Sequence, residues 1–210
     1  MDKARYIKLR ELVRRLRRSR RAQARQIDIL CNDMVEAHGE FVKRLKALNF
    51  GVSFYESILG RGDLRSLVDA AAKSIKSHVD DSNVAFFLCE CEGLNLHIVD
   101  ENKPVGIDRR ELQSYFTPEL VEKISRVNWV CSLDDMFEMG LEGDLGVLNK
   151  VSAAGVPIRQ RGPGVGFVLI YRSVEQRLSP EELAEVAGVM SGLCRAIESC
   201  KVSAATSGIS

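Results

Sequence analysis

Apolar residues recur at alternating steps of four and three along the first part of the chain. This heptad pattern is typical of a helix that supercoils against another helix. An extra four-residue step from Phe41 to Leu45 is a stutter, which locally unwinds a supercoil, and the pattern then continues to Leu59. The positions expected to form a dimer interface are Leu9, Val13, Leu16, Ile27, Leu30, Met34 and Phe41.

The sequence predicts one long helix over residues 1–60. No proline occurs before Pro104 and no glycine before Gly39. At ~1.5 Å per residue, such a helix is roughly 85 Å long, more than a single small domain can cover. We therefore expect it to pair with another helix, most simply its own copy, in either a parallel or an antiparallel arrangement. Two seam positions, Arg20 and Gln23, are polar and interrupt the apolar stripe.

Residues 61–202 are expected to form one α/β domain, followed by a small, polar and flexible tail over 203–210. Asp63 is a suitable cap for a helix after Gly60-Arg61-Gly62, and Thr117-Pro118 and Ser179-Pro180 mark two further helix starts. The helix from Ser179 is expected to end near Cys200. The predicted strands are residues 84–91, 94–99, 129–133, 151–158 and 165–172. Residues 134–148 are expected to form an acidic, glycine-containing loop with room for a helical turn.

Two stretches of this domain carry a family resemblance. The first runs from Asn83-Val-Ala-Phe-Phe-Leu-Cys-Glu through Leu94-Asn-Leu-His-Ile-Val99, and the second joins Gly155-Val-Pro-Ile158, Gly166-Phe-Val-Leu-Ile170 and Leu178-Ser-Pro-Glu-Glu-Leu183. Together they resemble the opening hairpin and the closing strands and helix of the GAF domain. The resemblance implies an α+β fold, with an antiparallel sheet flanked by helices, after a long N-terminal coiled-coil helix. It also implies a sensory or dimerisation module.

The resemblance further implies a ligand pocket between the sheet and residues 115–135. Tyr115, Phe116 and Trp129 are expected as apolar walls and Asp134 as a polar anchor, with Cys131 among the lining residues. Asn149-Lys150 is similar to the start of the motif in cyclic-nucleotide-binding members, but the matching Phe-xxx-Asp-Glu is absent. Neither the ligand nor a cofactor is identified by the sequence, and no residue is predicted to be catalytic.

The net charge of +1 hides a strong asymmetry. Residues 1–25 carry a net charge of +9 and the remainder −8. The basic arm is formed by Arg14, Arg15, Arg17, Arg18, Arg20 and Arg21. These arginines suit the phosphates of a nucleic acid or an acidic protein surface. No aromatic residue interleaves them for base stacking, so we favour a protein partner.

The six cysteines form no CxxC pair and no ligand-like spacing with histidine, so no metal site is predicted. Cys89, Cys91 and Cys131 are expected on neighbouring strands, either as small core residues or as the thiols of a GAF-type reductase. No apolar run approaches the ~20 residues of a membrane span, and the charged start lacks a secretory signal. These observations favour a cytoplasmic protein with reduced thiols.

The sequence is interpreted as a non-enzymatic signalling module. Its GAF-like domain is expected to sense a small molecule or to contact a signalling partner, and its N-terminal helix to form a homodimer. The alternatives that stay open are a thiol-based reductase and a nucleic-acid-associated protein that uses the basic arm.

Overall fold

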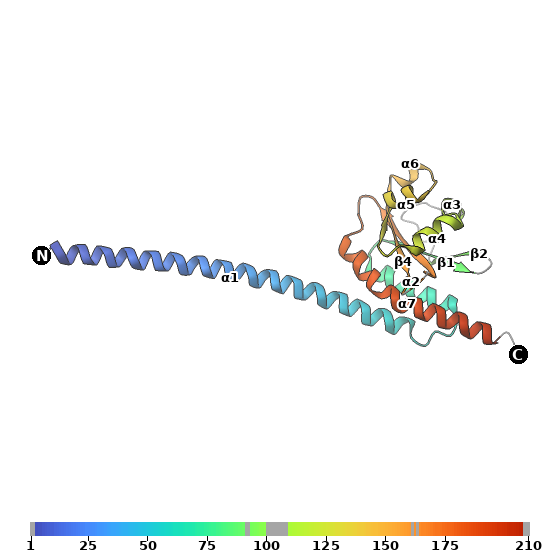
Figure 1. The fold of residues 1–210 in the computed structure, drawn as a ribbon, viewed down its shortest axis with the longest axis horizontal. Coiled ribbons are helices and arrows are strands. Elements are labelled where there is room, and N and C mark those ends of the chain that lie inside the picture. The colour runs from blue at the N-terminus through green and yellow to red at the C-terminus, as the bar shows by residue number, and fades with distance from the viewer. Residues whose placement is uncertain (1–2, 91–92, 100–108, 161, 163, 208–210) are drawn as a thin grey trace. The chain divides into compact units, whose positions relative to one another are not determined.

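The computed structural model describes residues 3–90, 93–99, 109–160, 162 and 164–207. The chain divides into two compact units, residues 1–48 and residues 49–210. Its elements follow one another as shown in Figure 1: α1 (Lys3–Ile58), α2 (Leu64–His78), β1 (Asn83–Glu90), β2 (Gly93–Val99), α3 (Arg109–Tyr115), α4 (Pro118–Arg126), β3 (Cys131–Ser132), α5 (Leu133–Met139), α6 (Leu145–Leu148), β4 (Val151–Ile158), β5 (Gly166–Ser173) and α7 (Pro180–Ser207).

The predicted long helix is confirmed by α1, which is continuous over 56 residues. Its part up to Leu48 makes up the first unit. All seven residues expected at the dimer interface are exposed in the single chain, with exposed fractions of 41–70%: Leu9, Val13, Leu16, Ile27, Leu30, Met34 and Phe41. The helix therefore presents an apolar seam that nothing in its own unit covers.

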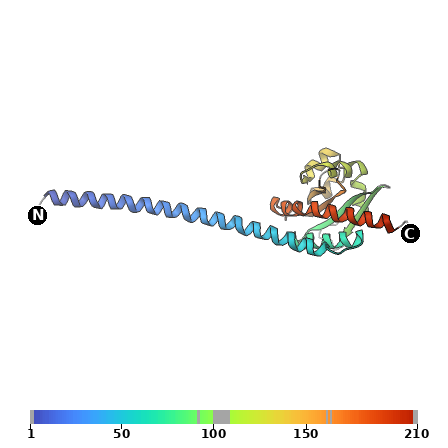
Figure 2. The ribbon, with the colours of Figure 1, turned by 60° about the horizontal axis from the view of Figure 1, so that its bottom comes forward.

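The last turns of α1 belong to the second unit. The face of the helix that is buried there is not the face marked by the heptad pattern. Phe50, Phe54 and Ile58 are buried in one core cluster with side chains of α2 and α7. The seam positions Val52 and Leu59 stay exposed on the other side of the helix. Figure 2 shows α7 running beside the end of α1. This end of the helix is thus part of the α/β core.

The sheet has five strands in the order β2-β1-β5-β4-β3, and every pair of neighbours is antiparallel. β4 and β5 pair so that Ile158 lies opposite Gly166. Gly166 has φ +152°, and a Cβ there would overlap the carbonyl oxygen of Phe87. Only glycine fits this close approach of β5 to β1. The strand expected over residues 129–133 is shorter and contains only Cys131 and Ser132.

Helices cover both faces of the sheet, with α2 and α7 on one face and α3–α6 on the other (Figure 1). The expected caps of α2, α4 and α7 are present, because Asp63, Thr117 and Ser179 each accept a hydrogen bond from a backbone N–H in the first turn.

Residues 134–148, expected to form an acidic loop with room for a helical turn, have more helix than that. This stretch contains α5 and α6, and α5 begins with a capping box between Ser132 and Asp135. A further helix, α3, lies in a stretch that the sequence analysis left without an element. The last helix continues beyond its expected end near Cys200 to Ser207, into the segment expected to be a flexible tail. Within the described ranges, no helix is both long and apolar enough to cross a membrane.

Candidate ligand-binding site

The alternation of β1 separates two cores on the two faces of the sheet. Val84, Phe86 and Leu88 point toward α2 and α7, and the end of α1 completes this layer. Ala85 and Phe87 point to the opposite face, where they pack with residues of α3, α4, α5 and β5. The candidate ligand site predicted from the sequence lies on this second face.

Three phenylalanine rings form the centre of the second face. The rings of Phe87 and Phe167, which lie opposite each other on β1 and β5, are stacked with centroids 4.8 Å apart and an interplanar angle of 6°. The ring of Phe116, just after α3, lies 4.7 Å from that of Phe87 and 5.6 Å from that of Phe167. The three rings join α3 to the middle of the sheet.

The helices α4 and α5 lie close to β4 on the same face. A Cβ added to Gly155 of β4 would come within 2.9 Å of Met136 Cε and 3.4 Å of Ile124 Cγ2. Met136 and Ile124 are both completely buried. Protein side chains therefore fill the space between β4 and these two helices.

The five residues predicted to line a pocket occupy different depths. Phe116 and Cys131 are buried in the core of the second face, and Tyr115 is half-buried against it. Trp129 is 54% exposed, and Asp134 is exposed in the first turn of α5. The structure thus brings Tyr115, Phe116 and Cys131 into one layer and places the other two at the surface.

The environment of Cys131 opposes thiolate chemistry. Burial, with a smaller contribution from the nearby carboxylate of Asp135, raises the pKa of the Cys131 thiol to about 11. The pKa of Asp135 itself is lowered, because its carboxylate accepts hydrogen bonds from the hydroxyl and the backbone N–H of Ser132. Cys131 is therefore a protonated core residue at neutral pH.

The remaining thiols do not assemble around Cys131. Cys89 is half-buried, with its Sγ 3.9 Å from Ser125 Oγ. On α7, burial raises the pKa of the Cys194 thiol, and the carboxylate of Glu198 acts in the same direction. Cys31 is exposed on α1, and Cys91 lies outside the described residues.

The sequence analysis missed Asn83 as a candidate ligand contact. It opens β1 directly opposite Tyr171 of β5, so both side chains face the second core. Asn83 is 7% exposed, and its side-chain nitrogen has no hydrogen-bond partner among the described residues. A buried donor without a partner costs about 1–3 kcal/mol, so a ligand acceptor would be stabilised here. In the sequence, Asn83 follows Asp80, Asp81 and Ser82, and such a polar run is typical of a turn and gives no sign of a ligand contact.

A hollow that the sequence did not predict lies on the opposite side of the second unit. It has a volume of about 480 Å³ and lies between the end of α1, the following turn and α7. Its apolar lining includes Tyr55, Ile58, Leu59, Leu67 and Ala196. Gly192 also lines it, and a Cβ at that position would overlap the ring of Tyr55.

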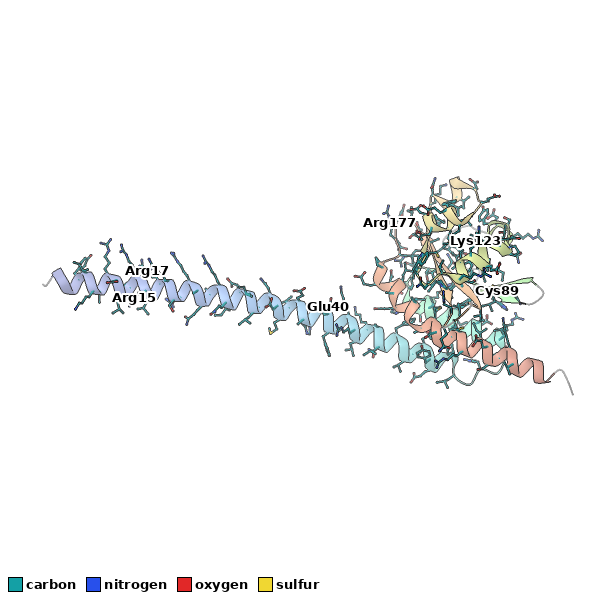
Figure 3. The ribbon with its side chains drawn as sticks, in the orientation of Figure 1. Arg15, Arg17, Glu40, Cys89, Lys123 and Arg177 are labelled. Carbon is teal, nitrogen blue, oxygen red and sulfur yellow. The ribbon has the colours of Figure 1, made fainter. Side chains whose placement is uncertain are left out.

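The six arginines of the basic arm are all exposed on α1: Arg14, Arg15, Arg17, Arg18, Arg20 and Arg21. Figure 3 shows Arg15 and Arg17 standing out from the helix. Arg15 lies 3.9 Å from Glu11, one helical turn away, in a weak exposed ion pair. In the part of the chain that the structure describes, no group of three His, Cys, Asp or Glu side chains is placed to hold a metal ion.

No known family model matches the sequence, and no curated protein matches it. Solved structures do match the fold. The GAF domain of a phosphoenolpyruvate-protein phosphotransferase from Coxiella burnetii aligns with a TM-score of 0.56 at 14% identity, covering 77% of this chain and 98% of that one. The corresponding domain from Acinetobacter aligns with a TM-score of 0.54 at 13% identity, covering 74% and 94%.

A third match is the GAF domain/HD domain protein from Geobacter sulfurreducens, with a TM-score of 0.52, 14% identity and coverage of 67% and 95%. At such low identity the likeness concerns the fold alone. The α/β part of this chain has the fold of a GAF domain.

Proposed function

We propose that this chain is a non-enzymatic regulatory module that forms a homodimer through its N-terminal helix. In this proposal, residues 1–60 are the dimerisation helix and residues 61–202 the regulatory domain, which recognises a small molecule or a signalling protein. The observation that carries the proposal is an exposed heptad seam on a helix that leads into a GAF fold.

The exposed seam supports the dimer because its side chains have no other apolar surface to contact within their unit. Burying one large apolar side chain contributes about 1.5–3 kcal/mol. An isolated helix gains little stability without such packing. Seven large apolar residues at heptad spacing, exposed by 41–70%, therefore favour a partner helix with the same spacing.

The ligand site is proposed on the sheet face covered by α3, α4 and α5. On the opposite face, α2, α7 and the end of α1 pack against the sheet. On the proposed face, Tyr115, Phe116 and Cys131 provide apolar surface, and Trp129 and Asp134 lie at the outer edge. The side-chain nitrogen of Asn83, which has no hydrogen-bond partner among the described residues, adds a donor that a ligand would satisfy.

The raised pKa of the Cys131 thiol, about 11, argues against Cys131 as the reactive thiol of the reductase alternative. The basic arm is proposed to contact an acidic protein surface. Binding of the arm to a nucleic acid is a less favoured possibility that can be tested directly. Deleting residues 1–25 removes a net charge of +9 and leaves the α/β core intact.

Sedimentation of seam variants tests the dimer. We expect the triple variant Ile27→Asp, Leu30→Asp, Met34→Asp to be a folded monomer, because charges would lie in the seam. The matched control is Ile29→Asp, Val35→Asp, which changes equally exposed apolar residues of the same helix outside the seam. A dimer that survives the triple substitution would place the interface elsewhere and overturn the proposal.

Fluorescence of Trp129, the single tryptophan of the chain, tests the ligand site. Native mass spectrometry of the purified protein identifies any retained small molecule, which is then titrated into ligand-free protein. We expect Tyr115→Ala and Asp134→Asn to weaken the spectral change. Glu138→Gln, another exposed carboxylate of α5, is expected to leave it unchanged. Binding unaffected by either site variant would place the ligand elsewhere.

Duplex DNA retention at several salt concentrations tests the arm. A nucleic-acid function predicts binding that falls steeply with salt and disappears without residues 1–25. We expect weak retention at physiological salt. Tight binding that is lost on truncation would instead support a nucleic-acid-associated protein.

A further inference from the structure

The seam of α1 contains one charged residue whose position distinguishes the two possible pairing directions. Arg20 occupies a seam position between Leu16 and Gln23. In a parallel, in-register pair each seam residue meets its own counterpart, so Arg20 would face a second Arg20 and Gln23 a second Gln23. Two like charges in one seam layer oppose association.

An antiparallel pair removes this conflict. One antiparallel register pairs all ten seam positions from residue 9 to residue 41. In this register Leu9 lies opposite Phe41, Val13 opposite Ala37, Leu16 opposite Met34, Arg20 opposite Leu30, and Gln23 opposite Ile27.

In that register each Arg20 meets an apolar residue with carboxylates nearby. Leu30 is flanked along its own helix by Asp28 and Asp33, both exposed. An arginine packs its aliphatic stem on apolar surface while its guanidinium reaches an acidic group at the edge. The polar interruption of the seam is thereby accommodated.

The charges beside the seam agree with the same direction. With 3.6 residues per turn, Lys8 and Arg15 lie on the same flank of the seam as Asp33, Glu36 and Glu40. In an antiparallel pair this flank of one helix lies beside the same flank of the second copy, which runs in the opposite direction. Lys8 then comes near the second copy's Glu40. Arg15 comes near the second copy's Asp33 and Glu36.

On the other flank, Arg21 of one helix lies at the same level along the axis as the second copy's Asp28 in this register. Figure 3 shows the side chains of Arg15 and Glu40 projecting from α1. Residues 26–42 contain four carboxylates and no Lys or Arg, against the net charge of +9 over residues 1–25.

We infer that α1 pairs with a second copy of this chain in antiparallel orientation. The arginine-rich half of each helix then lies against the acidic half of the other. This inference rests on the dimer proposed above and assigns its direction and its register. The acidic protein surface expected for the basic arm is, in this arrangement, the α1 helix of the second copy.

Distances between spin labels test the direction. Two full-length variants each carry one spin label on α1, the first at Gln26→Cys and the second at Gly39→Cys. Both are made in a Cys31→Ser background, and the Cys31→Ser protein without a new cysteine is the control. A Cβ at Gly39 meets no atom within 4 Å, so the substitution fits the helix.

In the antiparallel register position 26 lies close to its counterpart, and position 39 is separated from its counterpart by about 40 Å along the axis. We therefore expect a short distance for the first label and a long one for the second. Short distances at both positions would show a parallel pair and overturn this inference, while the proposed dimer would stand. A monomer would overturn both.

Charge reversal tests the register. The variant Asp33→Lys, Glu36→Lys, Glu40→Lys is expected to raise the dimer Kd by roughly tenfold or more. Adding Lys8→Glu and Arg15→Glu is expected to restore the dimer.

The matched control adds Arg10→Glu and Arg17→Glu instead, which changes the net charge equally but on the other flank of the seam. Restoration by this control to the same extent would show that only net charge matters and would overturn the assigned register.

Discussion

Arg172 of β5 and Glu182 of α7 form a two-point ion pair in which Nη2 lies 2.9 Å from Oε2 and Nη1 lies 3.2 Å from Oε1. The same guanidinium also donates to the backbone carbonyl oxygens of Asp80, Gln176 and Arg177. Five hydrogen bonds from one side chain thus join the end of β5, the turn before β1 and the start of α7. The planar fork of arginine suits this arrangement.

Replacing Arg172 with methionine is expected to lower the free energy of unfolding by roughly 2–4 kcal/mol. The substitution leaves a partly buried carboxylate and three carbonyl groups without their donor. The unfolding free energy of Arg172→Lys is expected to lie between those of the native chain and Arg172→Met. One ammonium group cannot reach the carboxylate of Glu182 and all three carbonyl groups at once. Urea denaturation at neutral pH measures the change. The exposed Arg177→Met is the control, and equal effects of the two methionine variants would contradict this role.

The free energy of unfolding is expected to depend on pH in the acid range because of Glu182. Burial acts to raise its pKa, but hydrogen bonds from Ser179 and Arg172 outweigh burial and lower the pKa below its ordinary value of 4.5. The stability that this carboxylate contributes is therefore complete above pH 4.5 and is lost as the pH falls through the lowered folded-state value. We expect the difference in unfolding free energy between the native chain and Glu182→Gln to be constant above that pH and to shrink below it. A difference that grows on acidification would have the wrong sign.

Gly192 is expected to be intolerant of any side chain. A Cβ at this position overlaps the ring of Tyr55, so either that ring must leave its place or α7 and the end of α1 must separate. Gly192→Ala should lower the free energy of unfolding by about 1–3 kcal/mol.

Gly188 provides the matched control on the same helix, since a Cβ there meets no atom within 4 Å. Gly188→Ala should be neutral or stabilising by up to ~1 kcal/mol. In the background of Tyr55→Ala, the cost of Gly192→Ala should largely disappear. Equal effects of the two glycine substitutions would exclude the contact as the cause.

Thiol alkylation should distinguish the cysteines by position. At neutral pH, the rise in the pKa of Cys131 from 9.0 to about 11 leaves about a hundredfold less thiolate, and burial hinders the reagent further. We expect exposed Cys31 to react first, and Cys131 and Cys194 to react only on unfolding. Peptide mass spectrometry after timed alkylation follows each site. Rapid labelling of Cys131 in the folded protein would restore the reductase hypothesis.

The sequence by itself determined the features that depend on near neighbours in the chain. The heptad spacing predicted α1, and Asp63, Thr117 and Ser179 predicted the starts of three helices. A cap is a hydrogen bond within three residues, so its signal is local and readable. The same reasoning could have found the capping box of Ser132 and Asp135, but a run of acidic residues and Gly140 suggested a loop instead.

Only the tertiary structure decided which surfaces these elements cover. The apolar residues near the end of α1 occupy two faces, and it is the face of Phe50, Phe54 and Ile58 that the α/β core buries. Trp129, expected as a pocket wall, is 54% exposed, and its position depends on contacts between segments distant in the sequence. Spacing along a helix predicts which residues share a face but not what that face will meet. The contact of Tyr55 with Gly192 joins residues distant in the sequence, and no local pattern predicts such a contact.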